Sequence, residues 1–560
     1  MMHHLSSTVC PRSYLMPGPD RRILLLTASA LLFGCQPSCE TEGLSDLFDT
    51  SPTFVRFPGR QLAKGRYDGL WLDGSVEQHG FVLARDLDDH SLTIIPFDGR
   101  DPCTVGPVAR YWSFLQAFGL QQFQGYVPFI ESVDETSRGE LQLATFDCQL
   151  SGVSLSDAGG PVRPAPAVTP PAYLAKQGGT TLFRLDPWND EQSVVAEQVG
   201  RLEFDGQYLW TIEGGEVVVR DRALNVQGRY GTGAIELLVW SSGRGYFTDQ
   251  EGLHKVSMQA NGKQANEKEG PLVEGACGIA TPRGGSSAYV ATLAPCAQSQ
   301  LVLVGTETDL PHILADNAAL GVHVSNLKTQ EYLTYVTDVD PSTGLGSLWT
   351  VTLGGKPVRI GTGASLGDVK APYNDRLPIV FHADGEPSRL SLWSPDGIVE
   401  VAQRVNDVAL PFVLHQYDGV TGTLSVLQSD DELEELATGV PALGSTLPDY
   451  RATLADFDGR TGTLILITSS ADGSYDVEPL ASGVPSPGYL FLRFADAISY
   501  LKDVEPDAGF GRLEIRFFST QETYGVDGVS EWMAMDWPDV GVVYSVVDGD
   551  RSGIWFGAFQ

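Results

Sequence analysis

One short pattern recurs along the chain and limits the folds that it can adopt: an apolar strand, a turn rich in Asp and Gly, and a second strand that begins near a Leu. Residues 416–424 (QYDGVTGTL) and 456–464 (DFDGRTGTL) are near copies of this pattern. One apolar residue in the second strand, here called its anchor, recurs twelve times between residues 92 and 554. The mean interval between anchors is 42 residues, and single intervals run from 34 to 49. The anchors are Leu92, Leu141, Leu182, Val217, Leu253, Leu301, Leu348, Leu390, Leu424, Leu464, Leu513 and Ile554. A period of this size indicates one repeated structural unit.

The repeated unit is predicted to be a small antiparallel sheet. A hairpin alone cannot bury its apolar face, whereas about 42 residues accommodate four short strands with their turns, which is the make-up of a propeller blade. The apolar run 463–467 (TLILI) is typical of a strand buried on both faces. Helical repeats fit poorly, because the chain has 62 Gly and 34 Pro and its candidate helices are interrupted by turns. The expected fold class is therefore all-β.

The pattern resembles bacterial β-propellers of the TolB-like class, whose blades combine an apolar strand, an Asp-Gly turn and a further apolar or aromatic strand. The resemblance covers nearly all of the chain after residue 52. Residues 393–397 (WSPDG) spell the pentapeptide best known from that class. Here they follow the Leu390 strand instead of preceding the first hairpin strand, so we interpret them as a turn.

Twelve units exceed a common propeller ring, which has about 4–8 blades. We expect two tandem six-bladed rings, residues 53–315 and 316–560, with a boundary near Ala315–Gly321. The alternative is a single ring of seven or eight blades in which some anchors share a blade. The Pro-rich segment 159–171 is stiff, and it is predicted to be either a domain linker or a long loop between blades.

The N-terminal segment has the features of an export signal. Arg21 and Arg22 precede the apolar run 23–33, which is too short for a membrane span of about 20 residues. Residues 32–35 (LFGC) resemble the lipobox of bacterial lipoproteins. The resemblance implies a signal peptide over 1–34, cleavage before Cys35 and diacylation of that cysteine. The alternative is an uncleaved membrane anchor.

Three further expectations concern this segment. The residues before Met16 are mostly polar, so translation is predicted to begin at Met16, the alternative being an unusually long positive region. Residues 35–52 are interpreted as a lipidated tether. Gln36 follows the cysteine where Asp often retains lipoproteins at the inner membrane, so the resemblance favours an outer-membrane location in the cell envelope. Two acyl chains give stable membrane attachment.

The chain is strongly acidic. Residues 1–34 contain three Arg and one Asp, and the remainder has 34 basic and 70 acidic side chains, a net charge of −36. This charge excludes nucleic acid as a partner, because nucleic-acid binding needs Lys and Arg to displace phosphate counterions. It also disfavours direct adhesion to anionic lipid headgroups. The acidity is interpreted as a solubility device, with an acidic binding site as the alternative.

The cysteines favour disulfides, because an exported protein meets an oxidising environment. Cys103 with Cys148 and Cys277 with Cys296 are the plausible pairs, although sequence does not fix connectivity. Cys39 is left in the tether. Zinc is disfavoured, since no C-x-x-C spacing occurs and no histidine lies near the cysteines.

Two short motifs suggest chemistry. Residues 363–367 (GASLG) match G-x-S-x-G, but a nucleophile elbow needs a following helix and Pro372 prevents one, so we interpret the motif as a loop between blades. Asp548, Asp550 and Ser552 resemble the start of a calcium loop, although Phe559 stands where a bidentate Glu is required. Similar fragments occur at 338–342 and 456–458. Aspartates are also common in hairpin turns, so calcium stays one of two interpretations.

The sequence contains no convincing catalytic constellation. No cofactor other than calcium is suggested. The favoured hypothesis is a non-enzymatic binding scaffold on the cell envelope that takes a protein or peptide ligand, by analogy of fold alone. The alternatives are a glycan-acting hydrolase or lyase with paired carboxylates, and a structural surface protein without a specific ligand.

Overall fold

The computed structural model describes sixteen segments of the chain. They are residues 55–73, 81–97, 99–111, 126–132, 138–165, 172–241, 243–258, 270–284, 288–382, 387–447, 450–470, 473–492, 495–505, 509–535, 541–547 and 549–559. The regular secondary structure of these segments is almost entirely β-strand, which confirms the all-β prediction. None of their helices is long and apolar enough to cross a membrane. The helices are short 3-10 turns: η2 (Cys296–Gln298), η3 (Leu366–Asp368) and η4 (Gly549–Arg551).

Antiparallel strands that follow one another in sequence form ten sheets in these segments. One sheet has three strands: β29 (Leu377–Phe381), β30 (Arg389–Ser394) and β31 (Gly397–Gln403). Seven sheets have four strands: β2 (Tyr67–Asp73), β3 (Phe81–Asp86), β4 (Ser91–Pro96) and β5 (Cys103–Pro107); β13 (Val199–Phe204), β14 (Leu209–Glu213), β15 (Glu216–Arg220) and β16 (Val226–Tyr230); β17 (Glu236–Ser241), β18 (Arg244–Thr248), β19 (Gly252–Ser257) and β20 (Val273–Glu274); β21 (Cys277–Ala280), β22 (Tyr289–Leu293), β23 (Leu301–Gly305) and β24 (Pro311–Ala315); β25 (His323–Leu327), β26 (Gln330–Thr337), β27 (Gly346–Val351) and β28 (Val358–Ala364); β32 (Asp407–Ala409), β33 (Phe412–His415), β34 (Gly422–Leu427) and β35 (Leu433–Val440); β36 (Ser445–Thr446), β37 (Tyr450–Ala455), β38 (Thr461–Ser469) and β39 (Tyr475–Pro485).

The two remaining sheets have seven strands each. One contains β6 (Arg110–Tyr111), β7 (Tyr126–Ile130), β8 (Arg138–Thr145), β9 (Leu150–Ala165), β10 (Ala172–Gln177), β11 (Thr181–Asp186) and β12 (Glu191–Ala196). The other contains β40 (Tyr489–Leu492), β41 (Ala497–Lys502), β42 (Gly511–Phe517), β43 (Thr523–Met535), β44 (Gly541–Val546), β45 (Gly553–Phe559) and β1 (Val55–Lys64). In each of these sheets, one long strand is shared by two successive four-stranded groups. The first half of β9 pairs with β8 and its second half with β10, and β43 pairs in the same way with β42 and β44.

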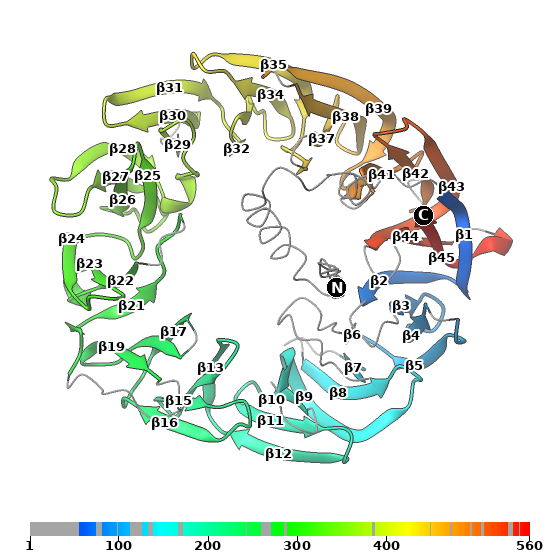
Figure 1. Cartoon of the computed structure of the whole chain (residues 1–560), viewed down its shortest axis with the longest axis horizontal. Coiled ribbons are helices and arrows are strands. Elements are labelled where there is room, and N and C mark those ends of the chain that lie inside the picture. Colours follow the sequence, from blue (N-terminus) through cyan, green and yellow to red (C-terminus); the bar gives the residue numbers. More distant parts are fainter. Residues whose placement is uncertain are drawn as a thin grey trace, which may run out of the picture.

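The sheets follow one another in chain order around a common centre, which gives a propeller-like fold (Figure 1). The first described strand pairs with the last, since β1 runs antiparallel to β45 from Val55 opposite Phe559 to Lys64 opposite Gly553. Figure 1 therefore shows one closed circuit, and the expected division into two tandem rings is not confirmed. The physical reason is that the two ends of the chain complete one sheet together. The expected boundary, Ala315–Gly321, connects β24 to β25.

The Pro-rich segment 159–171 is partly a strand. Gly159 to Ala165 belongs to β9 and pairs with β10 through Lys176 opposite Gly159 and Tyr173 opposite Pro164. Residues 166–171 lie outside the described part of the chain. The described half of this segment is thus neither a linker nor a loop.

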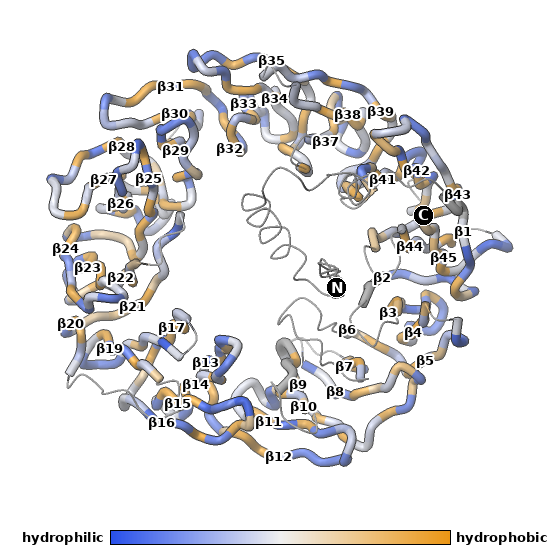
Figure 2. Tube along the Cα trace, viewed as in Figure 1, coloured by the Kyte–Doolittle hydropathy of each residue, from blue (hydrophilic) through white to orange (hydrophobic). Residues whose placement is uncertain are grey.

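The core lies between neighbouring sheets, as the anchor pattern predicts. All twelve anchors lie in strands, and their exposed fractions are 0 or 1%. Leu92 on β4, for example, belongs to one buried cluster with Phe129 on β7, which lies in the next sheet. Figure 2 shows apolar positions recurring along the strands around the whole circuit. Each sheet thus buries its faces against its neighbours, which a lone hairpin cannot do.

A backbone hydrogen bond links consecutive repeats near the end of an outer strand. The acceptor residue lies in that strand or within two residues of its end and has a positive φ, and its carbonyl accepts an N–H from a residue one to three positions after a strand of the next repeat. Eight such pairs occur in the described segments: Asp157 with Gly178, Gln198 with Gly214, Gly275 with Cys296, Asn317 with Asp338, Gly363 with His382, Arg404 with Tyr417, Gly439 with Phe457, and Gly528 with Val547. A buried Ala or Val follows each acceptor residue.

Two aromatic pairs link consecutive repeats at the start of the second strand. Tyr126 at the start of β7 meets Trp188 in the turn between β11 and β12, with ring centroids 4.9 Å apart. Phe412 at the start of β33 meets Tyr475 at the start of β39 in the same way, at 5.3 Å. These pairs add a second contact between consecutive repeats.

Candidate functional site

A polar surface pocket of about 320 Å³ lies at the hairpin formed by β11 and β12. Six residues line it: Arg184, Asp186, Asp190, Glu191, Gln192 and Ser193. The first two come from β11, Asp190 ends the turn, and the others begin β12, which is the outermost strand of its sheet. β12 lies at the periphery of the ring in Figure 1. The pocket volume is at the lower end of the range of about 300–1,000 Å³ that is usual for ligand sites.

Asp186 shapes the pocket turn. Its carboxylate is buried, and one oxygen accepts the backbone N–H groups of Trp188 and Asn189, both at 3.3 Å. The other oxygen accepts the Asn189 side-chain amide at 3.1 Å and the Arg184 guanidinium at 3.4 Å. An Asp that accepts backbone N–H groups two and three residues ahead favours this turn. Both oxygens of Asp186 are thus already used by the protein.

The turn is also fixed by contacts with β10 of its own repeat and with β7 and β9 of the preceding one. Trp188 stacks on Tyr173 with ring centroids 6.1 Å apart, and the Tyr126 hydroxyl donates to the Pro187 carbonyl at 3.1 Å. Asp190 accepts the backbone N–H of Gly152, on β9, at 2.7 Å. Burial, followed by the charges of Asp190 and Asp186, raises the pKa of Tyr126. The pocket wall is therefore held rigidly by contacts with β7, β9 and β10.

Arg184 is the cation of the pocket. Its side chain is 27% exposed, and its ion pair with Asp186 is long, at 3.4 Å. The Arg184 Nε is buried and has no hydrogen-bond partner among the described residues. A guanidinium has five N–H donors, so the bond to Asp186 uses only part of its capacity.

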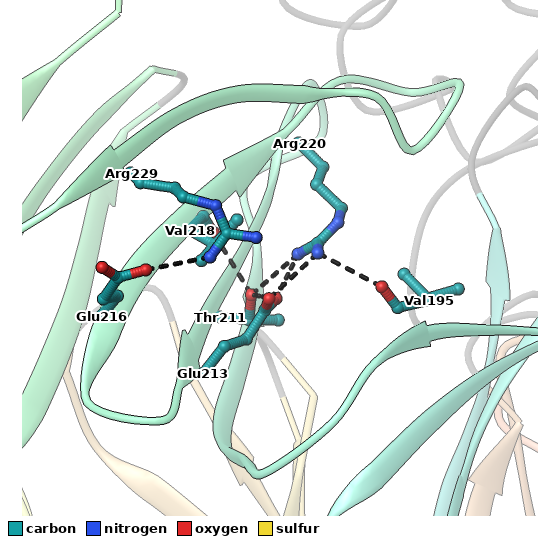
Figure 3. A network of polar contacts seen from close by, with 7 residues as sticks. All are labelled: Val195, Thr211, Glu213, Glu216, Val218, Arg220 and Arg229. Atoms are coloured by element: carbon teal, nitrogen blue, oxygen red, sulfur yellow. Dashed lines mark hydrogen bonds and ion pairs between the residues drawn. The ribbon is translucent and has the colours of Figure 1, made fainter.

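A buried ion-pair network holds β12 from the next sheet (Figure 3). Arg220 on β15 contacts the Glu213 carboxylate on β14, with its Nη2 3.0 Å from Oε2, and the same nitrogen donates to the Val195 carbonyl on β12 at 3.3 Å. The side chains of Arg220 and Glu213 are 4% and 9% exposed. Figure 3 also shows the exposed pair Arg229–Glu216, on β16 and β15, at 2.9 Å.

The G-x-S-x-G motif forms a turn between strands, as interpreted from the sequence. Ser365 precedes η3, and its hydroxyl donates to the Asp368 carboxylate at 2.7 Å while accepting the Gly367 N–H at 3.2 Å. His382 approaches the other oxygen of Asp368 at 3.2 Å. The carboxylate thus lies between the hydroxyl and the imidazole, whereas nucleophilic catalysis needs the histidine next to the serine.

The repeated aspartates cap their own turns. Asp418 accepts the N–H groups of Val420 and Thr421, both at 2.9 Å, and Asp458 accepts its two counterparts at 2.9 and 2.8 Å. These backbone bonds lower the pKa of both aspartates. Asp340 accepts the N–H and hydroxyl of Ser342 at 2.8 and 2.7 Å. The prediction that 416–424 and 456–464 are copies of one turn is confirmed.

The calcium prediction stays a prediction. Asp548 lies outside the described residues, Asp550 is exposed, and the Ser552 hydroxyl donates to the Gly549 carbonyl at 2.8 Å. In the described segments, no group of three or more His, Cys, Asp or Glu side chains is arranged to hold a metal ion.

Both proposed disulfides are present. Cys103, which begins β5, is bonded to Cys148 in the turn between β8 and β9, and so joins two neighbouring sheets. Cys277 on β21 is bonded to Cys296 at the start of η2, within one sheet. Their Cα–Cα distances are 5.8 and 5.7 Å. Cys35, Cys39, Met16 and the remaining residues of 1–54 lie outside the described part of the chain.

The Arg184 pocket was not predicted from the sequence. Acidic residues are too frequent in this chain for carboxylate pairs to be informative. A usable signal does exist in residues 186–191 (DPWNDE), where three acids and a Trp replace the Asp-Gly turn found in other repeats.

No protein-family model matches the chain, and no curated protein matches it. Solved structures with some similarity include a eukaryotic initiation factor, with 10% identity over 65% of this chain and 95% of that chain and a TM-score of 0.31. The tricorn protease is 11% identical over 85% of this chain and 48% of that chain, with a TM-score of 0.25. An oligogalacturonate lyase in complex with manganese is 12% identical over 60% of this chain and 99% of that chain, with a TM-score of 0.24.

Proposed function

We propose that this protein is an exported lipoprotein that serves as a binding scaffold on the cell envelope, with its repeats arranged as one ring of twelve TolB-like units. Twelve buried anchors and a single strand pairing between the chain ends support the ring. The lipobox-like residues ending at Cys35 support lipidation, and Gln36 supports the outer membrane. Two disulfides fit a protein that folds outside the cytoplasm.

The observation that carries the binding function is the way the Arg184 pocket is built. Both carboxylate oxygens of Asp186 accept hydrogen bonds within the turn, and the Asp190 carboxylate accepts the backbone N–H of Gly152. Carboxylates whose oxygens are already bonded within the protein position a site, whereas an acid or base catalyst must have its carboxyl group within hydrogen-bond reach of the substrate. A preformed polar pocket with fixed walls favours recognition of a ligand without its conversion.

Affinity capture from envelope fractions tests the binding function. The C35S protein is immobilised beside its R184M variant and an R229M control, which removes an exposed Arg from the neighbouring sheet. We expect a ligand retained by C35S and R229M and lost from R184M. Equal retention by all three, or no retained ligand, would contradict a binding site at this pocket.

Membrane attachment is tested separately. Replacing Cys35 by Ser removes the proposed acylation site, so the protein should move from the membrane pellet to the soluble envelope fraction. A C39S variant is the matched control and should stay in the pellet. Continued pelleting of the C35S protein would count against lipidation.

A glycan-acting hydrolase or lyase is the second candidate, because three carboxylates, those of Asp186, Asp190 and Glu191, line one pocket. Incubation with polysaccharides and measurement of new reducing ends or unsaturated products tests this alternative. Turnover that the E191Q variant abolishes would establish the enzyme in place of the scaffold.

A further inference from the structure

We infer that the Arg184 pocket binds a neutral saccharide, an inference that rests on the proposed binding function and names its ligand class. The pocket offers both donors and acceptors, since Arg184 and Asp186 on β11 lie opposite Ser193 and Glu191 on β12 and share one face with them. A ligand that presents donor and acceptor groups side by side matches this mixture. Adjacent hydroxyl groups on a sugar ring do so, because each hydroxyl is one donor and two acceptors.

The pairing of Arg184 with carboxylates favours hydroxyl ligands in particular. Arg184 keeps unused donors beside Asp190 and Glu191, and Glu191 is exposed. A ligand hydroxyl can accept from the guanidinium and donate to a carboxylate at the same time. Hydrogen bonds to charged groups are about twice as strong as neutral ones, so these contacts suit a ligand that is itself uncharged.

Charged ligands fit the same pocket less well. An anion would approach Arg184 but would also meet Asp190 and Glu191, and like charges at short range repel. A cation such as an ammonium group cannot accept a hydrogen bond from the guanidinium, so it would bond to the carboxylates alone. The three pocket carboxylates do not converge as a metal site within the described segments. A neutral hydroxyl ligand can bond to the guanidinium and to a carboxylate together.

The wall of the pocket is already fixed before a polar ligand binds. Trp188 and Asp190 fix the turn against β9 and β10, and Arg220 fixes β12 through the Val195 carbonyl. Ordering of flexible side chains and loops opposes binding, so a wall that is already fixed loses less affinity to it. Glu191 and Ser193 are exposed, so they are accessible to a ligand at the periphery of the ring.

Matched sugars test the ligand class directly. Saturation-transfer NMR and calorimetry on the C35S protein compare neutral hexoses and their β-linked dimers with the corresponding uronic acids and 2-amino sugars. We expect binding of at least one neutral sugar, and at least about tenfold weaker binding of its uronic acid and amine forms. The S193A variant should bind the neutral sugar about tenfold more weakly, since one hydrogen bond in a polar site contributes about 1.4 kcal/mol, while R229M should bind it unchanged.

The outcomes separate this inference from the proposed function. Tighter binding of a uronic acid or amino sugar, or binding that S193A and R184M leave unchanged, overturns the saccharide assignment. If no sugar binds but a ligand is captured from envelope fractions in a manner that depends on Arg184, the saccharide assignment is also overturned. The proposed binding function is then retained. Failure of both experiments overturns the two together.

Discussion

The carbonyl oxygen of Gly439 accepts the backbone N–H of Phe457 at 2.9 Å, which joins the outer strand of one sheet to the turn of the next. Gly439 has φ +64°, and a Cβ there would lie 2.8 Å from Cα and 2.9 Å from N of Asp456. The positive φ favours glycine, and the close approach to the Asp456 backbone requires it. The seven equivalent bonds elsewhere make this contact a repeated fastener of the ring.

Gly439→Ala should destabilise the protein markedly. An L-residue in the left-handed region costs about 1–2 kcal/mol, and displacement of the Asp456 backbone adds to that cost. Gly459→Ala is the matched control, because Gly459 also has a positive φ, +97°, but a Cβ there would meet nothing within 4 Å. Urea midpoints should fall further for G439A than for G459A. Equal urea midpoints of the two variants would mean that the close approach of Gly439 to Asp456 contributes nothing to stability.

The buried pair in Figure 3 should respond differently to single and double substitution. Arg220→Met leaves Glu213 buried without its partner, which should lower the free energy of unfolding by about 3–5 kcal/mol. The R220M/E213M double variant should recover most of that loss. R229M removes one member of an exposed pair and should change stability by less than about 1 kcal/mol. A double variant as unstable as R220M would contradict this account.

The strand anchors could be predicted from the sequence because each repeat must bury one large aliphatic side chain at the same place. Leu424 and Leu464, for example, are fully buried in equivalent strands. The links between repeats were harder to see. Asp157, Asn317 and Gly439 have unlike side chains but share a positive φ and a backbone contact. A sequence pattern of side chains does not reveal such a backbone requirement. The one sequence signal is the Ala or Val that follows each acceptor residue and is buried in the structure.

The number of rings and the candidate site depend on long-range contacts that local patterns do not contain. Closure of the circuit needs Val55 to meet Phe559 across the entire chain. The pocket needs Asp190 to meet Gly152 from the preceding repeat. In a chain with 71 acidic residues, no single Asp is distinctive until its partner is known.

The disulfides should stabilise the fold to different degrees. They close loops with sequence separations of 45 and 19, for which chain entropy gives about 4 and about 3 kcal/mol. The C103S/C148S variant should therefore have the lower urea midpoint of the two double variants. The comparison is made under oxidising conditions, and a reducing agent should bring the wild type below both variants. Insensitivity of the wild type to reduction would show that neither bond matters.

Two buried histidines should make the protein sensitive to mild acid. Burial lowers the pKa of His323, helped by the charge of Arg283, and burial also lowers the pKa of His415, against a smaller opposing effect of Glu435. Both remain neutral in the folded state and gain a proton more readily when unfolded. Their contribution to stability is therefore present above the unfolded pKa of about 6.5 and is lost as the pH falls through that value toward the lower folded pKa.

Replacement of these histidines tests the acid sensitivity. His323→Leu also removes two ring nitrogens that have no hydrogen-bond partner among the described residues. His415→Asn keeps a group able to bond the Ser425 hydroxyl, which lies 2.9 Å from the imidazole. The drop in urea midpoint between pH 7.5 and pH 5 should be smaller in the double variant than in the wild type. An unchanged drop would assign the acid sensitivity to other groups.

Strand β1 should be essential for closing the ring. Ala63 on β1 belongs to the same buried cluster as Ile554 and Phe556 on β45, and the Gln61 amide donates to the Ser552 carbonyl at 3.1 Å. A chain lacking residues 1–64 would leave β45 as an unpaired edge with exposed apolar side chains, and such edges promote self-association. Light scattering should show association that a peptide of sequence VRFPGRQLAK, residues 55–64, reverses. A chain lacking only residues 1–54 retains β1 and is the control. We expect it to have the same association state as the C35S protein. Equal size and stability of the two truncated chains would contradict closure by β1.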